Sequence, residues 1–560
     1  MTSVGRFSLK SETEDNRSIP TFFLALSGEK NMKKDDNDTT ATKTLQDYNN
    51  TNRKIFTVTD FEEQWLKQDM PLRHPRFHST VCDEQMYFNE IHHHVVDEDS
   101  DESNTTRIKA ELDQHASETM HYSVYREDLR NRIEHMLTSP LEVSNKLWEV
   151  KISNGKLCSS GAICKAKVDA IKKQSPGLKR KMTRGGLWRD ATYEVESVPM
   201  ESLLLFRSHH ALADGASIMA ALSDLCDEAE EIRADIEMKL KKWKRMGGGR
   251  KKSFLRRIWG RLMRLIKLCM WLLFGTLGAF MYQGYLQLTT RSNPFDAIRR
   301  DAEKKGLVQS GRSVSWCDGT PLDEVKKIAD TIGRAKGITI TVNDLFVSCV
   351  TAAVTRQLIE HEEFMAPIDA HKRKYVSSNI NVVVPVHLRG GVIIPGESVG
   401  NKIGAFVTRV PGEMLHDAVG GAICPTERLE KVHNSLLYSK KSPAPIVSYY
   451  IAKFCSNCLP ENWTKAMFQR ANANAVVAIS NNRGYEHKLH INGMTVESAA
   501  GFLPLPPGIP IGVVVQSYAG TMSLSVVAEK WAVPDGDKFL RWILDEYRRL
   551  RDVAIELEKK

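Results

Sequence analysis

The 560-residue chain has few cysteines for its length, and its ten cysteines follow no framework spacing. This excludes a small fold held together by disulfides and favours free thiols in a reducing compartment. Cys455 and Cys458 form a lone CxxC pair, and no second His or Cys pair follows at the spacing of a zinc site. The three histidines of residues 92–94 cannot all face one ion from a strand or a helix. We therefore expect no metal site.

Several functional signatures are also missing. Neither a GxxxxGK[ST] phosphate loop nor a GxGxxG dinucleotide motif occurs, which argues against the nucleotide-binding folds. No nucleophile elbow of the GxSxG type and no catalytic-cysteine signature is predicted. The first residues carry acidic side chains and no apolar core, so we expect neither a secretory signal nor a transit peptide.

Positive charge is concentrated in one segment. The net charge is +9, but thirteen Lys or Arg and no Asp or Glu lie between Lys239 and Lys267, so the rest of the chain carries −4. With 42% hydrophobic and 26% charged residues, most of that remainder can bury a large core. No nucleic-acid-binding fold is recognisable around the basic segment, so we expect no nucleic acid as a partner.

An uncharged segment, residues 268–290, follows the basic one. As a helix its most apolar part, Leu268–Tyr282, would rise about 22 Å, against about 30 Å of bilayer hydrocarbon. The basic flank, with Trp243 and Trp259 interleaved, suits an anionic membrane surface. A buried core helix is the alternative, but thirteen adjacent basic charges have no role in a core. We therefore predict that residues 239–290 contact a membrane lipid surface.

The remaining pattern alternates strands and helices, which predicts an α/β fold in two halves of similar size. We expect a mostly disordered leader over residues 1–52, in which the apolar stretch Thr21–Leu26 can dock as a strand or a helix turn. The first half is expected over 53–235, the basic and apolar linker over 236–310, and the second half over 311–560.

Hydrophobic periodicity and turn residues predict individual elements. Expected strands are 147–152, 202–207, 381–386, 475–480 and a hairpin of 511–518 with 521–529 that turns at Ala519-Gly520. Expected helices are 125–137, 216–231, 322–333, 341–361 and 537–556.

The most specific local signal is SHHALADG, residues 208–215, where an expected buried strand meets an expected helix. A histidine at a strand end can face a cleft between domains, and a pKa near neutrality suits a general base. The following Asp can orient the backbone or a partner side chain, and Gly215 lets the chain turn tightly beside a ligand. The alternative to a catalytic role is that both histidines are core residues whose ring nitrogens are bonded to backbone groups. Without a protein nucleophile, a histidine base implies direct attack by a deprotonated substrate.

HHxxxDG resembles the signature of the chloramphenicol acetyltransferase-like superfamily of CoA-dependent acyltransferases and condensation domains. Other stretches resemble the wax ester synthase/diacylglycerol acyltransferase (WS/DGAT) family: TVNDLF with Asn343 and Asp344, PVHLRG, VGNKIG, and GFLPLPPGIPIGVVVQSYAGTMSLSVV. The likeness covers roughly residues 122–550. Lys146-Leu147-Trp148 stands for the family's Pro-Leu-Trp, and residues 480–484 lack the prolines of its usual turn. Both departures fall near the expected acyl or acceptor channel.

The resemblance implies an α/β fold of two pseudo-symmetric chloramphenicol-acetyltransferase-like halves with a tunnel between them, plus a membrane-associated helical segment. It implies long-chain acyl-CoA as a substrate, no cofactor, and a fatty alcohol or diacylglycerol as acceptor. The expected catalytic residues are His210 as general base, His209 shaping the site and Asp214 in a structural role. The expected site-shaping residues are Gly215, Asn343, Asp344, and Arg389 as the ion-pair partner of Asp214. For Asn343 and Asp344, catalysis and helix capping both stay open.

A single membrane crossing by residues 268–290 would place His210 and the second half on opposite sides. We therefore predict an interfacial or re-entrant helix, with both halves cytosolic, at the endoplasmic reticulum membrane or a lipid droplet surface. A condensation-type enzyme using carrier-bound acyl groups is one alternative, disfavoured because no carrier domain is recognisable. A non-catalytic lipid-binding membrane protein is another, disfavoured because the histidine motif is intact. Wax ester and triacylglycerol synthesis both stay open.

Overall fold

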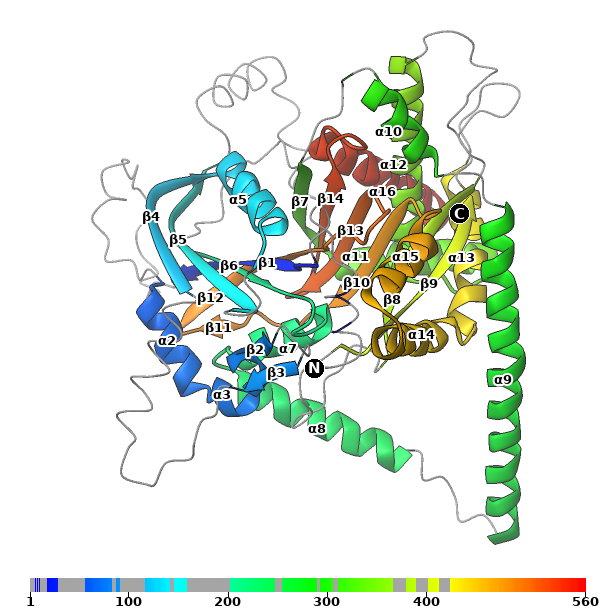
Figure 1. Ribbon diagram of the computed structural model, residues 1–560, viewed down its shortest axis with the longest axis horizontal. Coiled ribbons are helices and arrows are strands. Elements are labelled where there is room, and N and C mark those ends of the chain that lie inside the picture. The colour runs from blue at the N-terminus through cyan, green and yellow to red at the C-terminus, as the bar shows by residue number, and fades with distance from the viewer. Residues whose placement is uncertain are drawn as a thin grey trace.

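Two six-stranded sheets lie side by side, with helices packed on their outer faces (Figure 1). The computed structural model describes residues 6, 8, 10, 18–28, 56–82, 87–90, 116–141, 146–158, 202–246, 254–289, 293–304, 306, 311–365, 379–388, 401–411 and 424–559. This architecture confirms the predicted α/β fold with two halves. The histidines of residues 92–94 lie outside the described residues.

The first sheet has the strand order β11-β12-β1-β6-β5-β4. Its strands are β1 (Thr21–Gly28), β4 (Ala116–Tyr125), β5 (Trp148–Cys158), β6 (Ser202–Ser208), β11 (His490–Ile491) and β12 (Met494–Phe502). All seven residues of β6 are buried, in keeping with its apolar sequence and central position. A small separate sheet pairs β2 (Ser79–Cys82) with β3 (Tyr87–Glu90).

The second sheet has the order β7-β14-β13-β10-β8-β9. Its strands are β7 (Arg312–Pro321), β8 (Asn379–His387), β9 (Ile403–Pro411), β10 (Val477–Arg483), β13 (Ile511–Tyr518) and β14 (Thr521–Glu529). The predicted hairpin of β13 and β14 is confirmed. Its turn residues Ala519 and Gly520 have φ of 48° and 75°, the positive values that a two-residue type I′ turn requires.

The helices are α2 (Val58–Lys67), α3 (Met70–Arg73), the 3₁₀ turn η2 (Pro75–His78), α5 (Arg126–Thr138), α7 (Gly215–Asp224), α8 (Ala229–Met246), α9 (Phe254–Thr289), α10 (Pro294–Lys304), α11 (Leu322–Lys336), α12 (Val342–Met365), α13 (Pro425–Lys441), α14 (Ala444–Cys458), α15 (Glu461–Asn472) and α16 (Gly536–Lys559). The single helix expected over 216–231 is two helices. The turn between α7 and α8 is pinned to β11, because Asp227 N donates to His490 O at 2.8 Å and Glu228 accepts from His490 N at 3.0 Å.

The two sheets do not divide the chain at one boundary. Strand β1, from the leader expected to be mostly disordered, lies between β12 and β6. Strands β11 and β12, from the second half of the sequence, complete the same sheet. Phe22 of β1 faces Gly501 of β12, where an added Cβ would lie 2.7 Å from the Phe22 ring. Glycine at 501 thus allows the ring to pack across the neighbouring strand.

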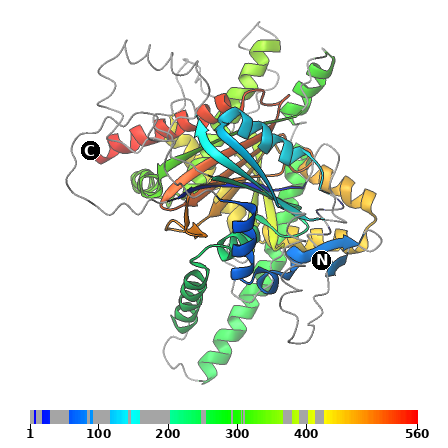
Figure 2. The same ribbon diagram turned by 90° about the vertical axis from the view of Figure 1, so that its left-hand side faces the viewer.

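Helix α9 is 36 residues long and lies along the outside of the second half (Figure 1). Within the described residues, Leu265–Leu286 is the one helical stretch long and apolar enough to cross a membrane, and only 6% of its most apolar window is buried. The buried-helix alternative is therefore wrong. Helix α8 and the first turns of α9 extend from the same side of the molecule in both views (Figure 2).

Candidate active site

The HHxxxDG segment forms a tight loop between β6 and α7. His209 N donates to Leu147 O and His210 N donates to Ser18 O, both at 2.7 Å. The His209 side chain is 1% exposed, and its Nδ1 accepts a hydrogen bond from Ala211 N at 3.0 Å. His209 is therefore turned into the loop, as the expected site-shaping role requires, and Leu147 of the Lys146-Leu147-Trp148 stretch helps to fix it.

Asp214 joins the loop to the second half of the chain. It is the fully buried N-cap residue of α7, and its Oδ1 accepts from Ser217 N at 2.9 Å. Its Oδ2 accepts from Lys402 N at 2.9 Å, and His387 Nε2 lies 3.6 Å away. Arg389, the expected ion-pair partner, lies outside the described residues. Asp214 therefore holds the two halves together at the site.

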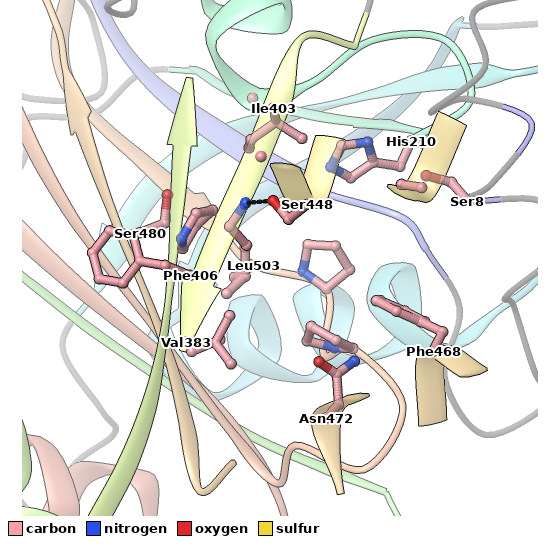
Figure 3. A pocket seen from close by; sticks show the side chains of 18 of the residues that line it. Ser8, His210, Val383, Ile403, Phe406, Ser448, Phe468, Asn472, Ser480 and Leu503 are labelled. Carbon is pink, nitrogen blue, oxygen red and sulfur yellow. Dashed lines mark hydrogen bonds between the residues drawn. The ribbon is translucent and has the colours of Figure 1, made fainter. Parts of the chain in front are cut away.

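His210 lines a cavity (Figure 3), and its ring is bonded to Asn401 from the second half. The His210 Nδ1 and Asn401 Oδ1 are 3.0 Å apart, and Asn401 Nδ2 donates to His210 O at 2.5 Å. The second bond fixes which amide atom faces the ring, and an amide oxygen can only accept. Nδ1 therefore carries the proton, and Nε2 keeps the lone pair that a general base needs.

The pKa of His210 is lowered from the ordinary histidine value. Burial is the main cause, since it disfavours the charged ring, and the negative charge of Asp214 offsets it only in part. His210 is consequently held in the neutral form near neutral pH. Asn401, as a neutral amide, orients the ring without adding a full charge beside it.

The cavity has a volume of about 540 Å³ and is lined by elements of both sheets together with α9, α14 and α15. This size falls within the range of small-molecule sites. The wall is mainly apolar, with side chains such as Phe22, Val383, Phe406, Leu503 and Phe468. A few polar groups interrupt it, among them Ser480 and Asn482 of β10. The stretch 480–484, which lacks the prolines of the family's usual turn, thus lies at the cavity.

Gly215 also lines the cavity, at the first residue of α7. A Cβ added there would lie 4.0 Å from Asn482 Nδ2, which is an ordinary contact. The position therefore contributes backbone to the cavity wall, and no steric conflict with Asn482 demands glycine.

Asn343 and Asp344 do not line the cavity that His210 lines. Asp344 is 1% exposed and accepts from His433 Nδ1 at 2.9 Å and from Lys440 Nζ at 2.7 Å. It also accepts from Thr341 N at 3.0 Å, at the start of α12. Asp344 therefore caps α12 and ties it to α13, as the capping alternative expects, and its part in shaping the site stays a prediction.

Asn401 was not expected as a site residue, although it lies within the VGNKIG stretch. The available signal was a polar amide just before a strand, in a motif of the predicted family. Contrary to the expectation that the GxSxG signature is missing, its spacing occurs once, as Gly396-Glu397-Ser398-Val399-Gly400, outside the described residues. Strand β9 follows it, whereas a nucleophile elbow leads from a strand into a helix.

Within the described part of the chain, no three His, Cys, Asp or Glu side chains are grouped so as to hold a metal ion. Cys455 is buried and lines the cavity, whereas Cys458 is exposed, so the CxxC thiols face different surroundings.

Residues 399–551 match the family model of the WS/DGAT C-terminal domain. No curated protein sequence matches the chain significantly. Among solved structures, a wax ester synthase/diacylglycerol acyltransferase from Marinobacter aquaeolei VT8 aligns with 99% of this chain and 100% of its own, at 14% identity and a TM-score of 0.50. A trichothecene 15-O-acetyltransferase from Fusarium sporotrichioides aligns with 98% of this chain and 94% of its own, at 12% identity and a TM-score of 0.55.

At these identities the two structures show a shared fold, and the family model identifies a WS/DGAT C-terminal domain over residues 399–551. The domain match contains Asn401 and Lys402, the residues that reach the histidine loop from the second half. The chain therefore carries a WS/DGAT C-terminal domain over residues 399–551, in a fold shared with a wax ester synthase/diacylglycerol acyltransferase of known structure.

Proposed function

We propose that this protein is an acyl-CoA-dependent O-acyltransferase that makes neutral lipids, and that His210 is its general base. One observation carries the proposal. His210 Nδ1 is bonded to Asn401, which leaves Nε2 as the basic atom of a ring that lines a mainly apolar cavity. A hydroxyl acceptor and a fatty acyl thioester both suit such a cavity, and neither needs a cofactor from the protein.

The reaction follows from that geometry. The acceptor hydroxyl gives its proton to His210 Nε2 as its oxygen attacks the thioester carbonyl carbon. The tetrahedral oxyanion collapses, the carbon–sulfur bond breaks, and the CoA thiolate takes the proton back from His210. The products are an ester and free CoA. His209 and Asp214 act by holding the loop, since their polar atoms are bonded to backbone groups.

The acceptor is a fatty alcohol, diacylglycerol or both, drawn from a membrane along residues 239–290. The packing of α9 supports an interfacial position. Trp271 Nε1 donates to Lys441 O and Gln283 Nε2 donates to Val407 O, both at 3.1 Å, so the helix is docked lengthwise on the second half. Such docking is what an interfacial helix requires if both halves are to share one cavity. We place the protein at the endoplasmic reticulum membrane or a lipid droplet surface, facing the cytosol.

A competition assay tests the proposal. Membranes with the full chain receive labelled acyl-CoA, with hexadecanol and diacylglycerol in the same tube and the His210→Ala protein as blank. Label in wax ester, triacylglycerol or both supports the proposal and identifies the acceptor. No label above the blank would contradict it and favour a carrier-bound donor or a lipid-binding protein.

Ser398→Ala is the matched control, because Ser398 is the serine of the GxSxG spacing. We expect this variant to keep wild-type activity and no acyl group to accumulate on the protein. Loss of activity in Ser398→Ala, with a trapped acyl-enzyme in the wild type, would replace direct attack with a covalent route.

A further inference from the structure

Helices α14 and α15 carry large apolar side chains that point away from the protein. Tyr450 and Phe454 of α14 are 59% and 60% exposed, and Trp463 of α15 is 66% exposed. The two helices are joined by the hydrogen bond from Thr464 Oγ1 to Cys455 O at 3.1 Å. An exposed aromatic cluster of this kind marks an interaction surface. Its residues lie at least 160 positions after the end of the membrane segment predicted from the sequence, residues 239–290.

This aromatic cluster is continuous with α9. A Cβ added at Gly275 of α9 would lie 2.7 Å from the Pro443 ring, next to the start of α14, so the two helices meet closely. The outward side of α9 is apolar as well, with Leu273 66% and Met281 68% exposed. The three helices lie in the same part of the molecule (Figure 1), and we take their exposed apolar side chains as one apolar face, formed by α9, α14 and α15.

The cavity reaches the surface within this apolar face. Phe280 of α9, Ile451 of α14 and Met467 of α15 all line the cavity, yet they are 53%, 37% and 46% exposed. A side chain that is both exposed and part of the wall marks the rim of an opening. The opening is therefore surrounded by the three helices that carry the outward apolar side chains.

The charge around the face indicates its partner. Residues 440–470 contain five Lys or Arg and one acidic residue, Glu461. The thirteen basic residues between Lys239 and Lys267 precede the apolar part of α9. Apolar and aromatic side chains with adjacent basic residues are typical of proteins that insert shallowly into anionic lipid surfaces.

We propose that α14 and α15 form, together with α9, a docking surface for an anionic phospholipid layer, with the cavity opening directly onto the lipid. Tyr450, Phe454 and Trp463 insert among the acyl chains, and the basic residues lie at the headgroups. This binding does not require the acyl-transfer reaction, so it can be tested independently of the proposed function.

The test uses the full chain and vesicles of phosphatidylcholine with phosphatidylserine. We expect the double variant Phe454→Ser/Trp463→Ser to lower the vesicle partition coefficient in flotation by about tenfold. The matched control is Leu72→Ser/Ile555→Ser, which removes two exposed apolar side chains elsewhere, 79% and 44% exposed. We expect this control to float like the wild type.

If α9 alone is enough to keep the double variant on vesicles, flotation cannot show whether α14 and α15 bind lipid. Amide hydrogen exchange of the wild type then tests whether these two helices contact the vesicles. The proposal predicts that vesicles slow exchange in residues 447–467 and leave α3 unchanged. No vesicle-dependent slowing in 447–467 would overturn it. A second outcome would also overturn the proposal: without vesicles, exchange in residues 447–467 slows as the protein concentration rises, and light scattering gives the mass of a dimer. That result would assign the apolar face to contact with a second copy of the chain.

Discussion

His210 and His433 are each bonded through Nδ1 to a side chain from a distant part of the sequence, and the two partners differ in charge. His210 is bonded to the neutral amide of Asn401 and lines the cavity. His433 is bonded to the carboxylate of Asp344, which also holds Lys440. His433 lines no part of that cavity. The first arrangement leaves a basic nitrogen where substrate can reach it, and the second fixes two helices to each other.

The difference lies in the charge of the partner. A carboxylate beside an imidazole stabilises its charged form, whereas an amide orients the ring without a full charge. Burial favours protonation of Asp344, but the charge of Lys440 and the hydrogen bonds from Lys440 and His433 outweigh it and lower its pKa. Asp344 therefore stays ionised within a structural ion network, and His210 stays neutral as a base.

The largest expected effect separates the two histidines. His210→Ala should lower kcat by a factor of about 10²–10⁴, the usual contribution of a general base. His433→Ala removes a buried ring from the other network and should leave kcat per folded molecule nearly unchanged. Steady-state kinetics with circular dichroism checks of folding measure both. Equal losses in the two variants would contradict the assignment of the base.

Removal of the amide should have an intermediate effect. Asn401→Ala leaves the His210 ring without its orienting bond and His210 O without a donor. The loss of such buried hydrogen bonds costs about 1–3 kcal/mol, so we expect kcat to fall by about 5–150-fold. KM for acyl-CoA should change little, because Asn401 acts through His210. A change confined to KM would instead make Asn401 a substrate-binding residue.

The smallest effect on activity is expected at Asp344. Asp344→Asn removes the charge that holds Lys440 and His433, so the free energy of unfolding should fall by about 1–3 kcal/mol. Specific activity of the folded enzyme should stay at the wild-type level. Urea unfolding and an activity assay below the transition measure the two quantities. If Asp344→Asn lost activity while its free energy of unfolding stayed unchanged, Asp344 would have a role in the reaction.

Local pattern predicted much of the fold. Strand β6 and the hairpin of β13 and β14 were expected close to where they lie, because a buried apolar run and a two-residue turn are short-range signals. The position of β1 between β12 and β6 was not predictable in the same way. It depends on pairing between residues about 480 positions apart, which leave no local signal.

In the candidate site, too, the local features could be predicted from the sequence and the long-range contacts could not. The histidine loop was recognisable from residues 208–215 alone, and the structure brings His209, His210 and Asp214 together there. Asn401 and Asp344 could not be sorted from sequence, because both are polar residues in family-like stretches. Only the fold shows that Asn401 reaches His210 and that Asp344 faces His433.

The pH dependence of kcat/KM for the wild type and Asn401→Asp tests the central claim most directly. The base must be neutral, so activity is lost as pH falls through the His210 pKa, which is lowered from 6.5. We predict a wild-type acid limb with its midpoint below pH 6.5. A carboxylate at position 401 should raise the His210 pKa and move that limb to higher pH. Identical acid limbs in the two proteins would contradict His210, held by Asn401, as the base.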